Sequence, residues 1–316
     1  MSDKKIIAVV GATGAQGGGL VRAILADKNS EFTPRAITRN PDSDAAKALA
    51  SAGVEVVKAD IDDVASLTHA LEGAHGAFFV TAFWEHFSPE TEMKHAKNMA
   101  AAAKATGVKH AIWSSLEDTR ELLPIDNGRM PTLMNKYNVP HFDAKGESNA
   151  FFAEAGVPTT VLNTAFYWDN LIHFGMGPRR QEDGSIVFAL PMDDKRLPGI
   201  AVADIGKAAY GIFKGGEKHI NKTVAIAGEH LSGAEMAAGL SEVLGEPVNY
   251  FAVPHDHFRS MDMPGAEDMG NMFQFKVEFE EQYVGARDLE VARALNPELH
   301  TFASWLKEHK DEIAVG

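Results

Sequence analysis

Cysteine is absent from the 316-residue sequence. The chain can therefore form no disulfide framework, no cysteine-based metal cluster and no catalytic thiolate. An excess of positive charge is missing as well, because 44 acidic residues outnumber 30 basic ones and give a formal net charge of −14. Nucleic acids and anionic membrane surfaces attract basic proteins, so this balance argues against either of them as the main partner.

Long apolar runs are also lacking. The longest, around residues 76–84, is much shorter than the roughly 20 residues that a membrane-spanning helix needs. Residues 1–5 lead straight into the first apolar run, with no segment that resembles a signal peptide. These features predict a cytoplasmic protein without a membrane partner. Hydrophobic residues make up 45% of the chain, which is enough for a sizeable buried core.

The first half of the sequence alternates regularly between short β-rich runs and helical patterns. Strands are predicted at residues 6–10, 33–38, 54–58, 76–80, 110–113 and 159–162. Helices are predicted between them at residues 15–26, 44–52, 64–71, 89–106 and 144–155. This alternation is typical of βαβ units. It predicts an α/β protein with a doubly wound parallel sheet of the Rossmann type.

The alternation ends after Leu162 and indicates a second domain. A segment rich in aromatic and turn-forming residues covers 163–195, and a Met-rich loop is predicted at 260–272. We predict a cofactor-binding domain formed by residues 1–162 plus about 200–228. A smaller, discontinuous α/β domain of about 163–199 and 229–316 then remains for a substrate or a partner protein.

The strongest local signal is a glycine-rich stretch directly after the first predicted strand. Three glycines occur at GxxGxxG spacing in residues 11–17, and a helical pattern begins inside this stretch. A strand, a tight glycine turn and a helix present backbone N–H groups and the positive end of a helix dipole to a pyrophosphate. A glycine-rich turn without a ligand is the alternative. The predicted dinucleotide contacts are Gly11, Thr13, Gly14, Ala15, Gln16 and Gly17.

The residues that end the second predicted strand select between the two nicotinamide cofactors. An Asp or Glu there would accept hydrogen bonds from the ribose 2′-OH of NAD and repel the 2′-phosphate of NADP. This chain has Thr38-Arg39-Asn40 instead. The guanidinium of Arg39 offers a positive charge and a planar set of donors to a 2′-phosphate, so it predicts NADP(H). A solvent-facing arginine in a loop is the alternative.

Further cofactor contacts are predicted where the third and fourth strands end. Asp60 and Ile61 follow the third strand, where an adenine can be held. Thr81, Ala82 and Phe83 follow the fourth strand, where the chain would pass the cofactor riboses. Each segment alone is an ordinary loop. They support the prediction together because the carboxyl ends of parallel strands meet at one edge of the sheet.

With these residues placed, the chain resembles the NmrA-like family, an atypical branch of the short-chain dehydrogenases, and within it the NADPH-sensor proteins. The stretches that carry the resemblance are residues 11–18, 38–41, 141–147 and 265–273. The resemblance implies a Rossmann-type domain that holds NADP(H) and a smaller C-terminal domain. It also implies two competing roles, which are reduction of carbonyl, quinone, alkene or imine compounds with NADPH, and redox-dependent regulation of a partner protein.

The catalytic motif of ordinary short-chain dehydrogenases is incomplete in this chain. They use Tyr-x-x-x-Lys with an upstream Ser, whereas the matching position here is His141-x-x-x-Lys145. Lys145 is expected to contact the cofactor, and His141 either donates a proton near neutral pH or only begins a helix. Ser114 and Ser115 follow the fifth strand, where the resemblance implies the catalytic serine. A helix cap at Ser115 is an equally good interpretation.

Two tyrosines elsewhere could be mistaken for the missing one. Tyr137 lies one helical turn before His141, but Pro140 is expected to break a helix between them. Tyr210-x-x-x-Lys214 matches the motif literally, yet it lies beyond the sixth predicted strand and is interpreted as a coincidence. The proton donor of a reductase would therefore be His141, a tyrosine or water.

A metal site is not predicted. His255-Asp256-His257 clusters three residues that can bind metals. The chain offers no cysteine, no His-Glu-x-x-His helix and no other placed carboxylate to complete a coordination sphere around them. An exposed loop is the expected structure of this segment.

Aromatic residues just past the strand ends are candidates for an apolar pocket. Trp84, Tyr167 and Trp168 are predicted to line it, and Phe166 is predicted to contact the cofactor. Packing in a core between the domains is the alternative for all of them. The expected partner is a small apolar substrate or a regulated protein, and a homodimer is one option for the assembly.

Overall fold

The computed structural model describes residues 4–126 and 128–316. These residues divide into two compact units whose segments alternate along the chain. Unit 1 consists of the described residues up to Asp118, with His141–Asn163 and Ala203–Val224. Unit 2 consists of the described residues of Thr119–Pro140, with Thr164–Val202 and Ala225–Gly316. No helix in the described ranges is long and apolar enough to cross a membrane.

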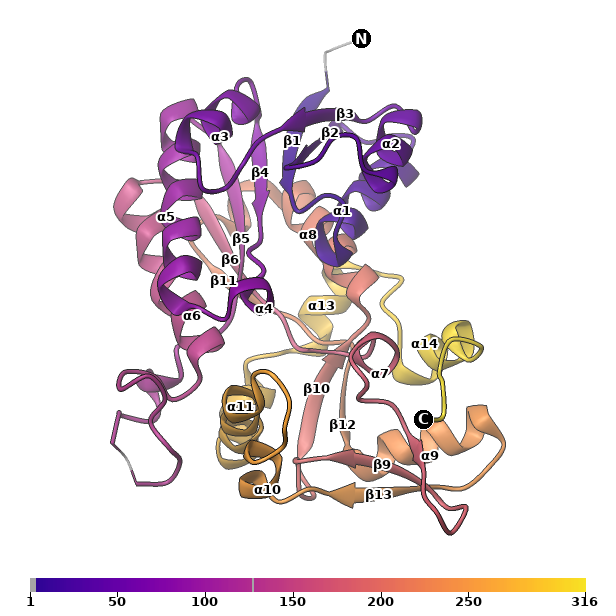
Figure 1. The fold of residues 1–316 in the computed structure, drawn as a ribbon. Coiled ribbons are helices and arrows are strands. Elements are labelled where there is room, and N and C mark those ends of the chain that lie inside the picture. The colour runs from indigo at the N-terminus through magenta and orange to yellow at the C-terminus, as the bar shows by residue number, and fades with distance from the viewer. Residues whose placement is uncertain (1–3, 127) are drawn as a thin grey trace. The chain divides into compact units, whose positions relative to one another are not determined.

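Unit 1 is built on a seven-stranded sheet in the order β11-β6-β5-β4-β1-β2-β3 (Figure 1). The strands are β1 (Lys5–Val10), β2 (Phe32–Thr38), β3 (Glu55–Lys58), β4 (Gly76–Phe79), β5 (His110–Ser115), β6 (Thr159–Asn163) and β11 (Thr223–Ala225). The pairs β1–β2, β1–β4, β2–β3, β4–β5 and β5–β6 are parallel. Every residue of β4 and β5 is buried, as expected for strands covered on both faces. The predicted doubly wound parallel sheet is confirmed.

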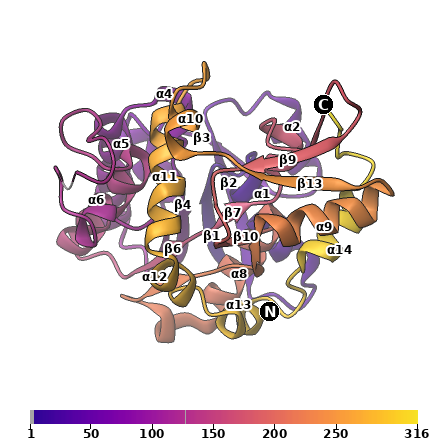
Figure 2. The same ribbon diagram turned by 90° about the horizontal axis from the view of Figure 1, so that it is seen from below.

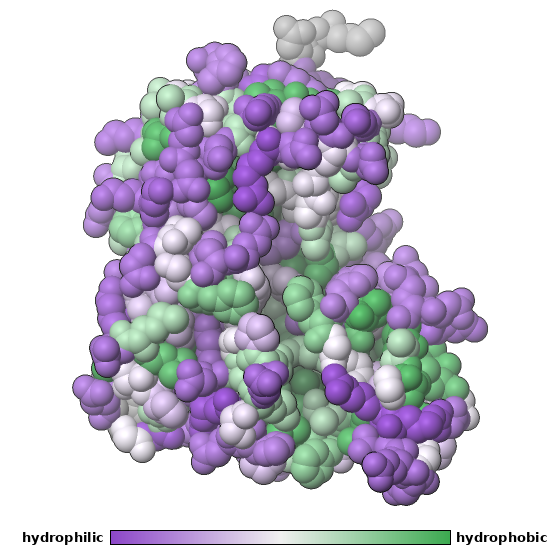
Figure 3. Space-filling view, viewed as in Figure 1, coloured by the Kyte–Doolittle hydropathy of each residue, from purple (hydrophilic) through white to green (hydrophobic). Residues whose placement is uncertain are grey.

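Helices cover both faces of this sheet. They are α1 (Ala15–Ala26), α2 (Asp44–Ser51), α3 (Val64–Leu71), α4 (Phe83–His86), α5 (Pro89–Thr106), α6 (Pro140–Ala155), α8 (Val202–Gly215) and the short 3₁₀ helix η2 (Gly216–His219). Leu67 of α3, Met99 of α5 and Phe152 of α6 share one buried apolar cluster with the sheet. Helices α1 and α8 lie together on the other face (Figure 1). Figure 3 shows mainly hydrophilic side chains over α3 and α5, as expected for helices with one face in solvent.

Helix α6 begins at Pro140, four residues before the predicted start at residue 144. Pro140 is the first residue of α6, a position that suits proline because its φ is helical and its missing N–H is not needed there, and the helix does not extend back to Tyr137, as expected. Tyr137 therefore lies outside α6, whereas His141 and Lys145 occupy its first two turns. These two residues are four positions apart, so their side chains lie on the same side of the helix.

Unit 2 contains two three-stranded sheets, ordered β12-β10-β7 and β13-β9-β8. Their strands are β7 (Phe166–Tyr167), β8 (Arg179–Arg180), β9 (Ile186–Leu190), β10 (Arg196–Ile200), β12 (Glu229–Ser232) and β13 (Val248–Ala252). The helices are η1 (Thr119–Glu121), α7 (Asn170–His173), α9 (Gly233–Leu244), α10 (His255–Arg259), α11 (Ala266–Glu278), α12 (Glu280–Gly285), α13 (Leu289–Leu295) and α14 (Phe302–His309). Strands β9 and β13 run side by side with α9 next to them (Figure 2).

Helix α11 corrects one expectation, because it occupies much of the segment that was predicted as a Met-rich loop. It begins after Gly265, which has a φ of +77° that suits glycine. Residues 270–276 are all buried, including the polar Asn271 and Gln274. A helix buried on all sides lacks the alternation of apolar and polar faces by which helices are recognised in a sequence.

The predicted boundaries placed residues 119–140 in the first domain, but the described residues of this segment pack within unit 2. The side-chain amide of Asn271 donates hydrogen bonds to the carbonyl oxygens of Pro131 (2.8 Å) and Asn138 (2.7 Å). Gln274 donates to the carbonyl oxygen of Arg129 (2.8 Å). Two amides of α11 therefore hold the backbone of this connection. The assignment of one unit to the cofactor and the other to a substrate or partner stays a prediction.

Candidate dinucleotide site

The glycine turn after β1 is fixed by its own backbone. Gly11 has a φ of +70°, a conformation that favours glycine, and its carbonyl oxygen accepts a hydrogen bond from the N–H of Gly14 (2.9 Å). A Cβ atom at position 17 would lie 2.4 Å from the carbonyl oxygen of Gly11. Only glycine therefore lets α1 begin this close to the turn.

The N-terminus of α1 is open to an anion. Gly14 is its N-cap, and within the described chain no side chain caps this end and no acidic residue lies in the first turn. The first N–H groups of a helix have no partner within the helix, and they carry the positive end of its dipole. The glycine turn and the N-terminus of α1 together form a cradle for an anion. This cradle presents the backbone N–H donors that a pyrophosphate requires.

A second pair of glycines fixes the direction of α1. A Cβ atom at Gly206 of α8 would lie 2.2 Å from the carbonyl carbon of Gly19. A Cβ atom at Gly19 would lie 3.2 Å from the carbonyl oxygen of Ala203. Helices α1 and α8 therefore touch through their backbones. The contribution of Gly206 was missed from the sequence, because the two glycines are far apart in the chain.

Arg39 follows β2 and faces an acidic side chain from another loop. Its Nη2 atom lies 3.1 Å from Oε2 of Glu85, which belongs to α4. Both side chains are well exposed, at 63% and 59%. Sequence reasoning did not identify Glu85, which lies 46 residues away and has no motif of its own.

The two residues predicted after β3 lie in a turn that its neighbours hold. The N–H of Asp60 donates to Oγ of Ser66 (3.0 Å), and Oδ1 of Asp60 accepts from the N–H of Asp62 (3.0 Å). The carbonyl oxygen of Ile61 accepts a hydrogen bond from Nδ2 of Asn98 on α5 (2.9 Å). These bonds fix the backbone of the turn.

Lys145 is held by a buried carboxylate that the sequence reasoning also missed. Its Nζ atom lies 2.8 Å from Oε1 of Glu92 on α5 and donates to Oγ1 of Thr81 at 2.6 Å. The hydroxyl of Thr81 donates in turn to Oε1 of Glu92, which is completely buried. Two predicted cofactor contacts, Thr81 and Lys145, are thus brought together around Glu92.

The charge of Glu92 is maintained by its partners. Burial alone would raise the pKa of this carboxyl, but the charge of Lys145 and the hydrogen bonds from Lys145 and Thr81 outweigh it and lower the pKa. His86 lies beside this carboxylate. Its Nδ1 accepts a hydrogen bond from the N–H of Ser88 (3.1 Å), and its Nε2 lies 3.3 Å from Oε2 of Glu92.

His141 lies in an aromatic cluster with residues from α4. The centroid of its ring is 4.8 Å from that of Trp84 and 5.8 Å from that of Phe83. Trp84 is 38% exposed, whereas His141 is 6% and Phe83 2% exposed. The structure therefore unites a predicted proton donor and a predicted pocket residue. Ala82 is the exposed N-cap of the same short helix.

The two serines at the end of β5 have different partners. Ser114 donates a hydrogen bond to Oε1 of Gln16 in the first turn of α1 (2.8 Å). Ser115 donates to Oδ1 of Asn149 (2.8 Å) and to the carbonyl oxygen of Lys145 (3.1 Å). Ser114 is thus linked to the helix after the glycine turn, while Ser115 fastens α6 to the sheet. Ser115 is the last residue of β5 rather than a helix cap.

The three aromatic residues predicted after β6 lie in unit 2. Phe166 is 5% exposed, and its ring lies 6.4 Å from that of Phe273. Tyr167 is half-buried, with its hydroxyl 3.3 Å from Oγ1 of Thr164. Trp168 is 1% exposed and packs against Phe302, so its contacts are those of a core side chain.

Tyr210 and the His255-Asp256-His257 segment have structural contacts. The hydroxyl of Tyr210 donates to Asp27 (2.8 Å) and lies 2.9 Å from Oγ of Ser30, and burial is the main cause that raises its pKa to about 12. His255 contacts the carbonyl oxygen of Pro191 (3.1 Å). Among the described residues there is no group of three or more side chains that could hold a metal ion.

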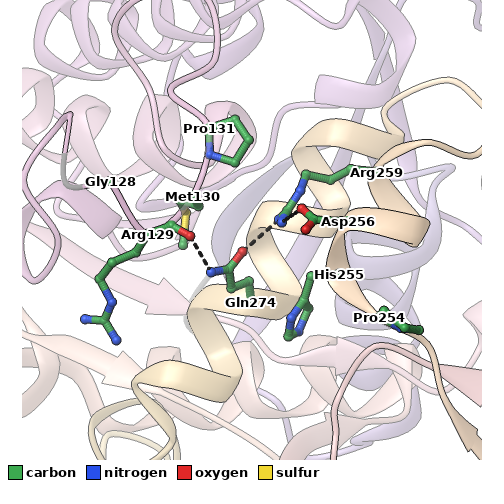
Figure 4. Close-up of a pocket in the computed structure, with 9 residues that line it drawn as sticks. All are labelled: Gly128, Arg129, Met130, Pro131, Pro254, His255, Asp256, Arg259 and Gln274. Carbon is green, nitrogen blue, oxygen red and sulfur yellow. Dashed lines mark hydrogen bonds and ion pairs between the residues drawn. The ribbon is translucent and has the colours of Figure 1, made fainter.

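Unit 2 also has an open pocket of about 470 Å³. It lies where residues 128–131 meet α10 and α11 (Figure 4). Arg259 pairs with Asp256 (2.6 Å) and donates to Gln274 (2.8 Å), and Arg129 pairs with Glu278 (2.9 Å). Both arginines that line the pocket are therefore paired with acidic neighbours. None of the predicted site residues lines this pocket.

Fold and site together define a nucleotide-binding protein of the Rossmann type. A family model described as the NmrA-like family matches residues 3–306. The chain belongs to the NmrA-like family, which confirms the resemblance seen in its motifs.

The sequence is also similar to those of two named enzymes. The chain is 32% identical over 289 residues to the NmrA-like family domain-containing oxidoreductase FrzB of Cladobotryum sp., with 85% of this chain and 83% of the relative covered. It is 28% identical to the NAD(P)H azoreductase of Xenophilus azovorans, with 96% and 98% covered.

Solved structures extend the likeness to the fold. NmrA, a negative transcriptional regulator, in complex with NADP is 25% identical and has a TM-score of 0.78, with 97% of this chain and 95% of that chain covered. A complex of NmrA with NAD has the same identity and TM-score, with 99% of both chains covered. These complexes support a nicotinamide dinucleotide as the cofactor.

Proposed function

We propose that the protein binds NADP(H) and uses it to reduce small apolar compounds that carry a carbonyl, quinone, alkene or imine group. One observation carries this proposal. The glycine turn follows β1, and the cluster of Trp84 and His141 includes the segment that follows the neighbouring strand β4. An anion-binding glycine turn and an aromatic residue that contacts the acid–base group His141 are therefore provided by adjacent strand ends.

The proposed cofactor contacts follow the strand ends of unit 1. The glycine turn would hold the pyrophosphate, and Arg39 would select NADP(H) by binding the 2′-phosphate. Asp60 and Ile61 would border the adenine, and Thr81, Ala82, Phe83 and Lys145 would border the riboses. When bound, NADPH supplies the hydride for a reduction.

The chain itself must supply the proton and the surface for the substrate. We assign the donation of this proton to His141, whose imidazole can act as a general acid. The exposed ring of Trp84 offers a flat apolar surface beside it. Lys145 would orient the ribose after partial release from Glu92. Ser114 would hold the electronegative atom of the substrate.

Two relatives support a reductase. FrzB is named an oxidoreductase, and the Xenophilus azovorans protein is named an NAD(P)H azoreductase. The test measures NADPH consumption with a panel of quinones, enals, cyclic imines and azo compounds. Turnover above background with at least one class is expected, and none with any class contradicts catalysis.

The role of His141 is tested with the same assay. His141→Phe keeps an aromatic ring against Trp84 but removes the proton, so kcat is expected to fall roughly 100-fold or more. His69→Phe is the matched control, because His69 is a strongly exposed residue of α3. An unchanged kcat in His141→Phe shows that another group or water donates the proton.

A redox sensor that regulates a partner protein is the second candidate. Two observations favour it. The NADP complex with 25% identity is that of a negative transcriptional regulator, and the catalytic tyrosine of ordinary short-chain dehydrogenases is a histidine here. In this case NADPH and NADP⁺ would stabilise different shapes. Limited proteolysis and oligomeric state are expected to differ between the two cofactor forms, and identical results contradict the sensor.

A further inference from the structure

The ion pair between Arg39 and Glu85 connects a loop and a short helix on opposite sides of the glycine turn. Arg39 follows β2 and Glu85 lies in α4, which follows β4. Strand β1 lies between β2 and β4 in the sheet and ends in the turn (Figure 1). The pair is therefore made by the strand ends that flank the proposed cradle for the pyrophosphate.

The carboxylate of Glu85 binds the guanidinium of Arg39 as an anionic ligand would. Nη2 of Arg39 lies 3.1 Å and 3.5 Å from the two carboxylate oxygens of Glu85. Among the described residues, no other side chain forms a hydrogen bond or ion pair with either group. One guanidinium nitrogen thus makes the whole contact. Exposed ion pairs of this kind are weak, so a stronger anion can replace the carboxylate.

We propose that Glu85 is a specificity-determining residue, which competes with the 2′-phosphate of NADP(H) for Arg39. The inference rests on the proposed binding of NADP(H) in unit 1. A phosphate carries more charge than a carboxylate and presents oxygens in the geometry that a guanidinium binds through two nitrogens. NADH has no 2′-phosphate and leaves the pair intact. Glu85 therefore weakens NADPH binding without affecting NADH binding.

The neighbours of Glu85 show how it can be released. Phe83 is buried, Trp84 packs on His141, and His86 lies beside the buried Glu92. Helix α4 is thus held on both sides of Glu85, whose own side chain is 59% exposed. Displacement by a phosphate requires only a rotation of this side chain, while the helix stays in place.

Titration calorimetry of the 316-residue protein with NADPH and with NADH tests the proposal. Glu85→Gln keeps the size of the side chain and removes its charge. It is expected to lower the Kd for NADPH roughly 2- to 5-fold, the change that an exposed ion pair is worth, and to leave the Kd for NADH unchanged. Glu90→Gln, an exposed glutamate at the start of α5, is the control for the loss of one negative charge.

Smaller nucleotides show which part of NADPH is responsible for the change in affinity. Adenosine 2′,5′-bisphosphate should gain affinity in Glu85→Gln by the same factor as NADPH, whereas 5′-AMP should not. The proposal is overturned if Glu85→Gln leaves the Kd for NADPH unchanged, or if NADPH and NADH gain equally. Failure of the proposed cofactor site is a different result. In that case Arg39→Ala would also leave the Kd for NADPH unchanged, whatever Glu85→Gln does.

Discussion

The glycine turn after β1 and the first turns of α6 belong to the same proposed site, but different forces hold them. The turn is fixed by backbone contacts, since a side chain at Gly17 would collide with Gly11. The start of α6 is fixed by the ion pair of Lys145 with the buried Glu92 of α5. One part of the site therefore depends on the absence of side chains and the other on charge. Substitution and acid should affect the two parts differently.

The largest effect is expected from removing one member of the buried pair. Glu92→Leu leaves the mostly buried Lys145 without its counter-charge, so the free energy of unfolding should fall by about 3–5 kcal/mol. Urea denaturation measures this change. The double variant Glu92→Leu with Lys145→Met should recover much of the loss. Glu90→Leu on the exposed side of α5 is the control, and equal losses in the two single variants contradict the importance of the pair.

Arg39→Ala tests the phosphate end of the glycine-turn region. Loss of a charge-assisted bond to the 2′-phosphate should weaken NADPH binding by about 2–3 kcal/mol and change NADH binding little. Titration calorimetry with both cofactors gives the two values. Lys47→Ala removes an exposed positive charge from α2 and should affect neither. Equal losses for NADPH and NADH refute a 2′-phosphate contact at Arg39.

Gly17→Ala tests the backbone contact itself. The added Cβ would lie 2.4 Å from the carbonyl oxygen of Gly11, so turn and helix must move apart. The free energy of unfolding should fall by about 1–3 kcal/mol, as for other overpacked sites, and NADPH binding should weaken. Gly285→Ala is the control, because no atom lies within 4 Å of a Cβ there. Thermal unfolding of both variants, with and without NADPH, provides the measurement.

The smallest expected effect is a loss of stability that occurs only at acidic pH. The folded protein lowers the pKa of Glu92 below its ordinary value of 4.5, so the pair contributes stability above that pH and loses it as the pH falls through the folded pKa. Stability of the wild type should therefore decrease more steeply than that of Glu92→Gln below about pH 4.5. Urea denaturation at a series of pH values between 3 and 6 tests this difference. Parallel curves contradict it.

The comparison also explains which parts of the site could be predicted from the sequence. The glycine turn is encoded within a few consecutive residues, so its spacing predicted both the turn and the following helix. Lys145 was identified by its place in a motif, but Glu92 lies 53 residues before it and has no local signature. Its role depends on the fold, which brings α5 and α6 to the same face of the sheet.

The aromatic contact of the site and the glycine contact between α1 and α8 also could not be predicted from the sequence. Trp84 and His141 were each identified as candidates, but the contact between them appears only in the folded chain. The contact of Gly19 with Gly206 is likewise made by two distant helices. In unit 2, the continuous burial of residues 270–276 concealed the helical pattern of α11. Patterns within one element were thus readable, whereas contacts between elements were not.

The exposure of Trp84 has a practical consequence. The chain has four tryptophans, of which Trp113, Trp168 and Trp305 are at most 1% exposed, while Trp84 is 38% exposed. A water-soluble quencher such as iodide will therefore act mainly on the fluorescence of the ring that packs against His141. Because cysteine is absent, a single introduced thiol would also carry a dye at one defined position. Trp84 can thus serve as a fluorescence donor beside the proposed site, and a dye on an introduced cysteine can serve as the acceptor.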